Sequence, residues 1–288
     1  MLKGLAITPP VIGRISIGRV IEKNGKRLPE KDDQFTITTQ VQTKEGWALH
    51  PMDVTLRKDA NAKLRSIPVR VLFNDPDLNL RAEYSAFDRA TGRPICVGNG
   101  ETCRRLTQDG IESLPCPAPE GCTFGKGLCK PYGRLNVVVG DEDCFGTFIF
   151  RTTSFNSIRT LSARLRYYQA ASGGRLAALP LELKLRGKST TQSHRSAIYF
   201  VDLVVRSGST LEEAMTLARD VDEKRKVAGF DQESLDEAAR KGFGLGAFEE
   251  SIEEAIEVVE EFYQATEVAE RTFDERSSKL SKKLQLKL

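Results

Sequence analysis

Hydrophobic and polar residues alternate along most of the first 100 residues, and this pattern predicts β-strands. The alternation is clear over residues 11–21 and 67–73, where apolar side chains recur at every second position. Asn24-Gly25 follows the first run and is typical of a hairpin turn. Residues 78–87 alternate again and precede a short apolar run at 94–97. The first third of the chain is therefore expected to be β-rich.

In the next hundred residues, the spacing of apolar residues changes once from the strand period to the helix period. Strand patterns at 135–139, 145–150, 179–185 and 197–205 surround one segment with helical spacing. Thr153 or Ser154 can cap that helix, and Gly173-Gly174 can end it. One face of the helix is apolar and is expected to join the core: Phe155, Ile158, Leu161, Leu165 and Tyr168.

From Thr210 onward the pattern is helical. Thr210 and Glu213 form a capping box that opens a helix to about residue 227, and a shorter helix is predicted over 231–241. Residues from Glu249 onward predict a long amphipathic helix. The predicted fold class is α+β: a β-rich core over 1–208 with one central helix and an inserted Cys-rich zinc-binding segment at 96–131, followed by a helical C-terminal region over 209–288. That region is interpreted as a coiled coil or a partner-binding arm.

Charge is segregated along the chain, although the net charge is only +3. Residues 1–210 carry a net charge of +11, residues 211–275 carry −13 and residues 276–288 carry +5. This distribution suits contacts with a polyanion or a protein, and an acidic helix face exposed to solvent is the alternative. The chain has no apolar run of transmembrane length and no secretory signal pattern at its start, so no membrane partner and a cytoplasmic location are expected.

Four cysteines fall within 27 residues of a segment rich in proline and glycine: Cys103, Cys116, Cys122 and Cys129. Because the segment has too little apolar periodicity to predict a helix or a strand, we expect it to be held by a structural Zn²⁺ bound to these four thiolates. Cys96 or Cys144 could replace one ligand, and buried free thiols are the alternative reading. A catalytic zinc fits less well, because such sites use His or carboxylate ligands and the chain has only His50 and His194.

A basic band follows the cysteines. Residues 151–206 contain 10 Lys and Arg but only 2 acidic residues, Glu182 and Asp202. Such a band suits phosphates or an acidic protein partner, and Tyr167 could stack on a base. The candidate nucleic-acid or partner-binding residues are Arg151, Arg159, Arg166, Lys184, Arg186, Lys188 and Arg195.

Motifs of catalysis are missing from the sequence. Gly121-x-x-x-Gly125-Lys126 has one residue too few for a P-loop and no Ser or Thr after the lysine. The acidic run 141–143 is expected to be a hairpin turn, because consecutive carboxylates on a strand point to alternate faces. There is no G-x-S-x-G, H-E-x-x-H or G-x-G-x-x-G. A metal-dependent hydrolase therefore has little support.

Three stretches carry a family resemblance: Lys-Pro-Tyr-Gly-Arg-Leu at 130–135, Phe-Arg-Thr-Thr-Ser-Phe-Asn-Ser-Ile at 150–158, and Gly-Arg-Leu-Ala-Ala-Leu-Pro-Leu at 174–181. With the cysteine segment, they make residues 1–210 similar to the recombination directionality factor-like proteins of phages and integrative elements. The acidic helical tail departs from the resemblance.

The resemblance implies a non-enzymatic accessory protein in a bacterial host cell. Such factors bind the large serine integrase of their element and switch it from integration to excision. DNA would be contacted directly or through the integrase, and the C-terminal helices would meet the integrase or a second copy of the chain. A single-strand DNA binding or annealing protein of a mobile element is the alternative function.

Overall fold

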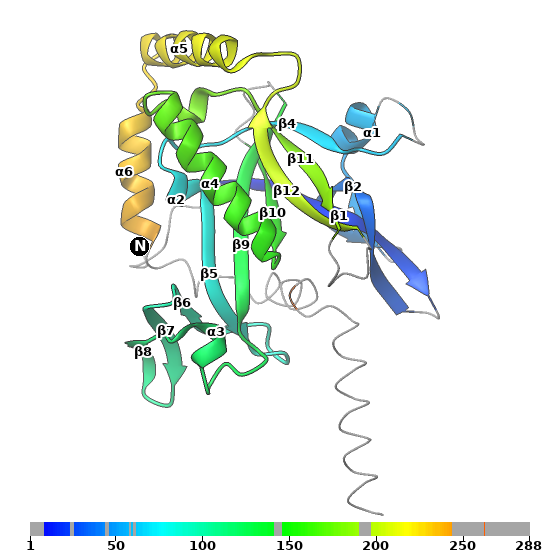
Figure 1. Ribbon diagram of the computed structural model, residues 1–288, viewed down its shortest axis with the longest axis vertical. Helices are drawn as coiled ribbons and strands as arrows, with labels where there is room; N and C mark the ends of the chain where they lie inside the picture. The colour runs from blue at the N-terminus through cyan, green and yellow to red at the C-terminus, as the bar shows by residue number, and fades with distance from the viewer. Residues whose placement is uncertain are drawn as a thin grey trace, which may run out of the picture.

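The computed structural model describes residues 9–23, 26–43, 46–57, 59, 62–140, 146–189, 197–243 and 262 (Figure 1). Its strands are β1 (Val11–Lys23), β2 (Lys26–Thr43), β3 (Gly46–Leu49), β4 (Ser66–Arg70), β5 (Leu80–Phe87), β6 (Pro94–Gly98), β7 (Thr102–Thr107), β8 (Gly110–Pro115), β9 (Lys130–Val139), β10 (Thr147–Thr152), β11 (Leu181–Lys188) and β12 (Ile198–Val205). Its helices are α1 (Pro51–Arg57), α2 (Pro76–Asn79), α3 (Ala118–Gly121), α4 (Phe155–Ala171), the 3₁₀ turn η1 (Leu176–Ala178), α5 (Leu211–Val227) and α6 (Gln232–Phe243). The α+β, strand-rich class is thus confirmed.

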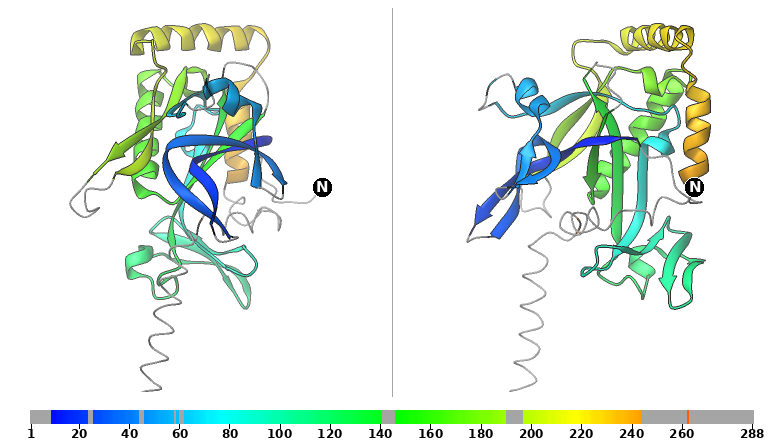
Figure 2. Two further views of the ribbon diagram at one scale, coloured as in Figure 1. Left: turned by 90° about the vertical axis from the view of Figure 1, so that its right-hand side faces the viewer. Right: turned by 180° about the vertical axis from the view of Figure 1, so that it is seen from behind.

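The strands form one branched sheet with β9 at the branch. Its main path runs β3-β2-β1-β10-β9-β5-β6-β7-β8, and β12-β11-β4 joins it because β4 also pairs with the end of β9. β1 pairs with β10 in parallel, whereas the other pairings are antiparallel. The right-hand view of Figure 2 shows the β1–β2 hairpin at one side of the molecule, and both views show β6–β8 at its lower end. The strand order therefore places the cysteine-bearing strands at one edge of the sheet.

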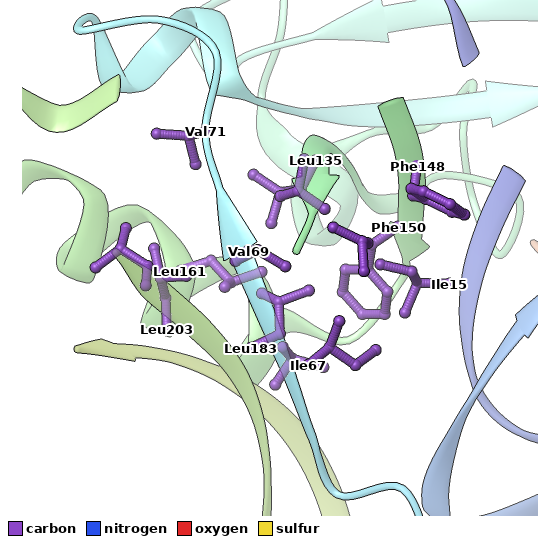
Figure 3. Close-up of a cluster of buried hydrophobic side chains, with 14 of the residues drawn as sticks. Ile15, Ile67, Val69, Val71, Leu135, Phe148, Phe150, Leu161, Leu183 and Leu203 are labelled. Atoms are coloured by element: carbon purple, nitrogen blue, oxygen red, sulfur yellow. The ribbon is translucent and has the colours of Figure 1, made fainter. Parts of the chain in front are cut away.

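The hydrophobic core fills the angle between the two branches (Figure 3). Phe148 and Phe150 of β10, Leu135 of β9, and Leu183 of β11 are almost completely shielded from solvent. Each such side chain contributes about 1.5–3 kcal/mol relative to an exposed position. Apolar residues from β1, β4, the segment just after β4, α4 and β12 complete the cluster: Ile15, Ile67, Val69, Val71, Leu161 and Leu203.

Helix α4 covers the core, as its apolar spacing predicts. Ser154 caps it by accepting a hydrogen bond from the backbone N–H of Ser157. Leu161, Leu165 and Tyr168 are buried. The prediction for Phe155 was wrong, because its side chain is 56% exposed. As the first residue of the helix, Phe155 lies ahead of the turns that pack on the sheet.

The predicted capping box opens α5, where Thr210 and Glu213 exchange hydrogen bonds. Helix α5 lies across the upper end of the molecule and α6 runs down one side (Figure 1). Asp236 ties α6 to the body by accepting a hydrogen bond from the backbone N–H of Asn74, at 3.1 Å. The long helix predicted from Glu249 lies outside the described residues, apart from Phe262.

Two buried polar side chains stabilise the backbone at two places: Asn79 at the start of β5, and Asp53 where α1 packs against β2. Asn79 accepts hydrogen bonds from the N–H groups of Leu72 and Phe73 and donates to two carbonyls. This geometry makes residues 76–79 a short helix, so the strand begins at Leu80 and not at residue 78 as predicted. Asp53 of α1, a helix not predicted, accepts a hydrogen bond from the N–H of Ile37 at 2.8 Å and pairs with Arg57.

Candidate functional site

The cysteine segment contains regular structure, contrary to the sequence-based expectation. β7 and β8 form a hairpin that extends the sheet beyond β6. Most β8 side chains are exposed, so neither face has the apolar alternation that would have revealed the strand. In the register, Gly98 lies opposite Cys103. Residues two apart on a strand share a face, so Cys96 and Cys103 project to the same side of the hairpin.

The remaining cysteines of the segment approach that side. A Cβ built on Gly98 would lie 3.0 Å from the Sγ of Cys116, and one built on Gly125 would lie 3.6 and 3.7 Å from the Sγ atoms of Cys122 and Cys129. These two glycines leave the space that the sulfur atoms use. The backbone N–H of Gly125 donates a hydrogen bond to the Sγ of Cys122 at 3.3 Å. Such N–H···S bonds favour the thiolate form of a cysteine.

Two opposing effects act on the charge of the sulfur atoms: burial disfavours the thiolate form, whereas the nearby guanidinium of Arg105 favours it. Burial raises the pKa of Cys129 to about 12 and that of Cys103 to about 11, so both thiols hold their protons at pH 7 without a bound cation. The guanidinium of Arg105 lies over the ring of Phe124 at 4.2 Å, and its Nη2 is 4.0 Å from the Sγ of Cys122. A hydrogen bond to Cys96 raises the pKa of Arg105.

Soft sulfur donors are the ligands that Zn²⁺ prefers, so the chemistry of this cluster fits the predicted metal. Cys96, which the sequence offered only as a substitute ligand, packs in one cluster with Cys103, Cys116 and Cys129. Within the described residues, however, no group of three or more His, Cys, Asp or Glu side chains is arranged to hold a metal ion. The zinc site therefore stays a prediction. Cys144 and the acidic run 141–143 lie outside the described residues.

The basic band divides between two surfaces. On the first, β11 and β12 lie against α4, and Asp202 of β12 pairs with Arg164 at 3.1 Å and Arg186 at 3.3 Å. Lys188 of β11 donates a hydrogen bond to Asn156 of α4 at 2.9 Å. Helix α4 and β11 thus form one cationic surface, which includes Arg164, a residue not singled out from the sequence.

Other members of the band lie along the same surface. Arg159 and Arg166 are exposed on α4, and Arg166 pairs with Asp77 at 2.8 Å. Lys184 lies 3.5 Å from Glu182. Tyr167 is 54% exposed beside Arg166. Arg195 lies outside the described residues.

Arg151 lies on the second surface, the opposite face of the sheet. A Cβ on Gly133 would lie 2.9 Å from Ile158 of α4, so the odd-numbered residues in this part of β9 face α4 and Arg134 faces away. Arg151 is directly opposite Arg134 in the register, and directly opposed residues share a face. Sequence reasoning could not separate Arg151 from the other cations, because the register that divides them is set by long-range pairing.

Comparison with known proteins gives one match. Residues 12–206 match the model of a family described as recombination directionality factor-like. That span runs from β1 through the cysteine segment and α4 to the end of β12. No curated protein and no solved structure matches the chain. No helix in the described part of the chain is long and apolar enough to cross a membrane.

Proposed function

Because the chain belongs to the recombination directionality factor-like family, we propose that it is a non-enzymatic accessory protein of site-specific recombination. In this role it binds the large serine integrase of its mobile element and shifts the integrase from integration to excision. The observation that carries the proposal is the family match over residues 12–206. It supports a role in recombination, and the integrase partner is our extension of it.

The α4–β11 surface is the part of the described structure best suited to an acidic protein or to DNA phosphates. Asp202 and Glu182 neutralise some of its charge, whereas Arg159 extends from α4 into solvent. Surface charge of this kind steers association and fixes orientation more than it adds affinity. We therefore assign recognition of the integrase, or of DNA held by it, to this surface.

We further propose that a structural zinc ion holds the cysteine cluster, with Cys103, Cys116, Cys122 and Cys129 as ligands and Cys96 as the nearest substitute. The metal would fix the segment from Cys116 to Cys129, which contains only the four-residue helix α3, against the β6–β8 hairpins. A module fixed in this way presents its loops in one orientation to a partner.

An excision assay tests the function directly. Purified chain, cognate integrase and DNA carrying attL and attR are combined, and the recombinant product is quantified. The amount of recombinant product should rise when the chain is added, and an unchanged amount would refute the proposal. Arg159→Glu should reduce the stimulation. Arg219→Glu, a matched exposed arginine on α5, should leave it unchanged.

A single-strand DNA binding protein is the second candidate, favoured by the exposed ring of Tyr167 beside the cations of α4. Base stacking on an aromatic ring contributes about 1–3 kcal/mol per base. Oligonucleotide binding in the absence of integrase, weakened by salt and by Tyr167→Ala, would support this function. No binding at low salt would remove it.

A further inference from the structure

Three arginines form a row on the sheet face turned away from α4. Arg81 of β5 lies directly opposite Arg134 of β9, and Arg134 lies directly opposite Arg151 of β10. Directly opposed residues on neighbouring strands have Cβ atoms about 4.5–5.5 Å apart, and like charges in such positions repel. Arg134 is only 9% exposed. A row of this kind is stable only where carboxylates or other anions lie against it.

Glu83 of β5 supplies one carboxylate, with its Oε2 3.5 Å from the Nη2 of Arg134. Lys130 of β9, an even-numbered residue like Arg134, adds a further cation to the same face. Among the residues named here, which all belong to the described part of the chain, cations outnumber carboxylates on this face, and such a face suits an acidic segment.

An aromatic socket adjoins the arginine row. Tyr132 lies two residues before Arg134 on β9, and the Arg134 guanidinium is 5.5 Å from its ring centroid. Phe87 meets Tyr132 edge to face at 5.4 Å. The ring of Phe262 closes the socket, at 4.8 Å from Phe87 and 5.7 Å from Tyr132, and Phe262 is only 1% exposed. Aromatic pairs in this arrangement contribute about 0.5–1.5 kcal/mol each beyond their buried area.

The sequence that precedes Phe262 carries the complementary charge. Seven of the thirteen residues 249–261 are glutamate, and none is lysine or arginine. Glu260 and Glu261 immediately precede Phe262, so covalent geometry keeps their Cα atoms within about 8 Å of its own. The Nζ of Lys130 lies 5.8 Å from the Phe262 ring. An acidic segment anchored by Phe262 in the socket would therefore have carboxylates within reach of the cationic face.

We propose that the sheet face made by Arg81, Arg134 and Arg151 is the docking site of the chain's own acidic C-terminal segment, with Phe262 as the anchor. Leu128 links the docking site to the cysteine module, because it packs both against the Phe87–Tyr132–Phe262 cluster and against the cysteines. This inference does not depend on the proposed role in recombination.

Photocrosslinking in the full-length chain tests the docking. Phe262 is replaced by p-benzoylphenylalanine, and crosslinked peptides are mapped by mass spectrometry after irradiation. We expect crosslinks to the peptides that contain Phe87 and Tyr132. The same photoreactive residue at Phe230 is the control, and it should crosslink to the pocket lined by Ala177, Arg225 and Gln232. Absence of the β5 and β9 crosslinks, with the control intact, would overturn the proposal.

Isotope mixing and charge reversal complete the test. In an equal mixture of ¹⁵N-labelled and unlabelled protein, crosslinks within one isotope support docking in the same chain, whereas mixed crosslinks would assign the site to a second copy and overturn it. Reversing Glu260 and Glu261 to lysine should lower the crosslink yield at least threefold. Reversing Glu233 and Glu237, exposed on α6, should not. An unchanged yield after the first reversal would show that the arginine row does not hold the segment.

Discussion

Gly125 leaves no room for a side chain beside Cys129, and one added methyl group there tests the zinc proposal. A Cβ on Gly125 would lie 2.7 Å from the Cβ of Cys129. Carbon atoms in contact normally lie about 3.5–4.0 Å apart, so one backbone segment must move by about 1 Å. This movement would separate Cys122 from Cys129 and lengthen the N–H···S bond to Cys122. Overpacking of this kind costs about 1–3 kcal/mol. It corresponds to a loss of about 5- to 150-fold in zinc affinity.

The assay measures zinc per chain by elemental analysis and zinc affinity by competition with a chelator. Gly125→Ala should bind zinc more weakly than the wild type. Gly121→Ala is the matched control, because its added Cβ would lie 3.2 Å from Pro117, where a shift of a few tenths of an ångström suffices. Equal affinities for Gly125→Ala and the wild type would refute the packing argument. A wild-type content below about one zinc per two chains would refute the metal itself.

Three further predictions concern the body of the molecule, each read out by urea unfolding. Asp53→Ala leaves Arg57 largely buried without its carboxylate and should cost about 3–5 kcal/mol, whereas the exposed Thr55→Ala should cost less than about 0.5 kcal/mol; similar losses would contradict the buried pair. Asn79→Ala leaves two backbone N–H groups without their acceptor and should cost at least about 2 kcal/mol, and a smaller loss would show that water replaces the amide. Burial raises the pKa of Asp236, so its stabilising effect is greatest at low pH and falls as pH rises through the raised pKa. The free energy of unfolding of Asp236→Asn should equal or exceed that of the wild type at pH 7, and any such advantage should disappear below the ordinary aspartate pKa. If the variant is less stable than the wild type at pH 7 but not at low pH, this argument is contradicted.

Local signals in the sequence predicted the elements that short-range physics determines. Ser154 caps α4, and Thr210 and Glu213 open α5, because the partners in each cap are only three residues apart. The alternation over residues 67–73 located β4, because one of its faces is buried. The exposed strand β8 lacks such a buried face, so its residues carried no detectable period.

Features that depend on register could not be predicted in this way. The parallel pairing of β1 with β10 joins segments more than 130 residues apart, and no local pattern specifies such a partner. The same is true of Cys96, which joins the other cysteines because Gly98 lies opposite Cys103. The arginine row is a third case, since Arg81, Arg134 and Arg151 meet only after β5, β9 and β10 have paired.

Register also changes the meaning of the charge segregation seen in the sequence. Taken as a sequence, the basic body and the acidic tail form two blocks, and either could serve a partner. In the structure, the basic residues divide between the α4–β11 surface and the Arg81–Arg134–Arg151 row, on opposite faces of β9. If Phe262 keeps the acidic segment on the row, the α4–β11 surface is the one left to meet an integrase or DNA. Charge reversal at Arg159 should then reduce the stimulation of recombination without changing the Phe262 crosslinks. Charge reversal at Glu260 and Glu261 should instead lower the yield of the Phe262 crosslinks. The two sets of variants therefore separate the two faces, which a change in total charge could not do.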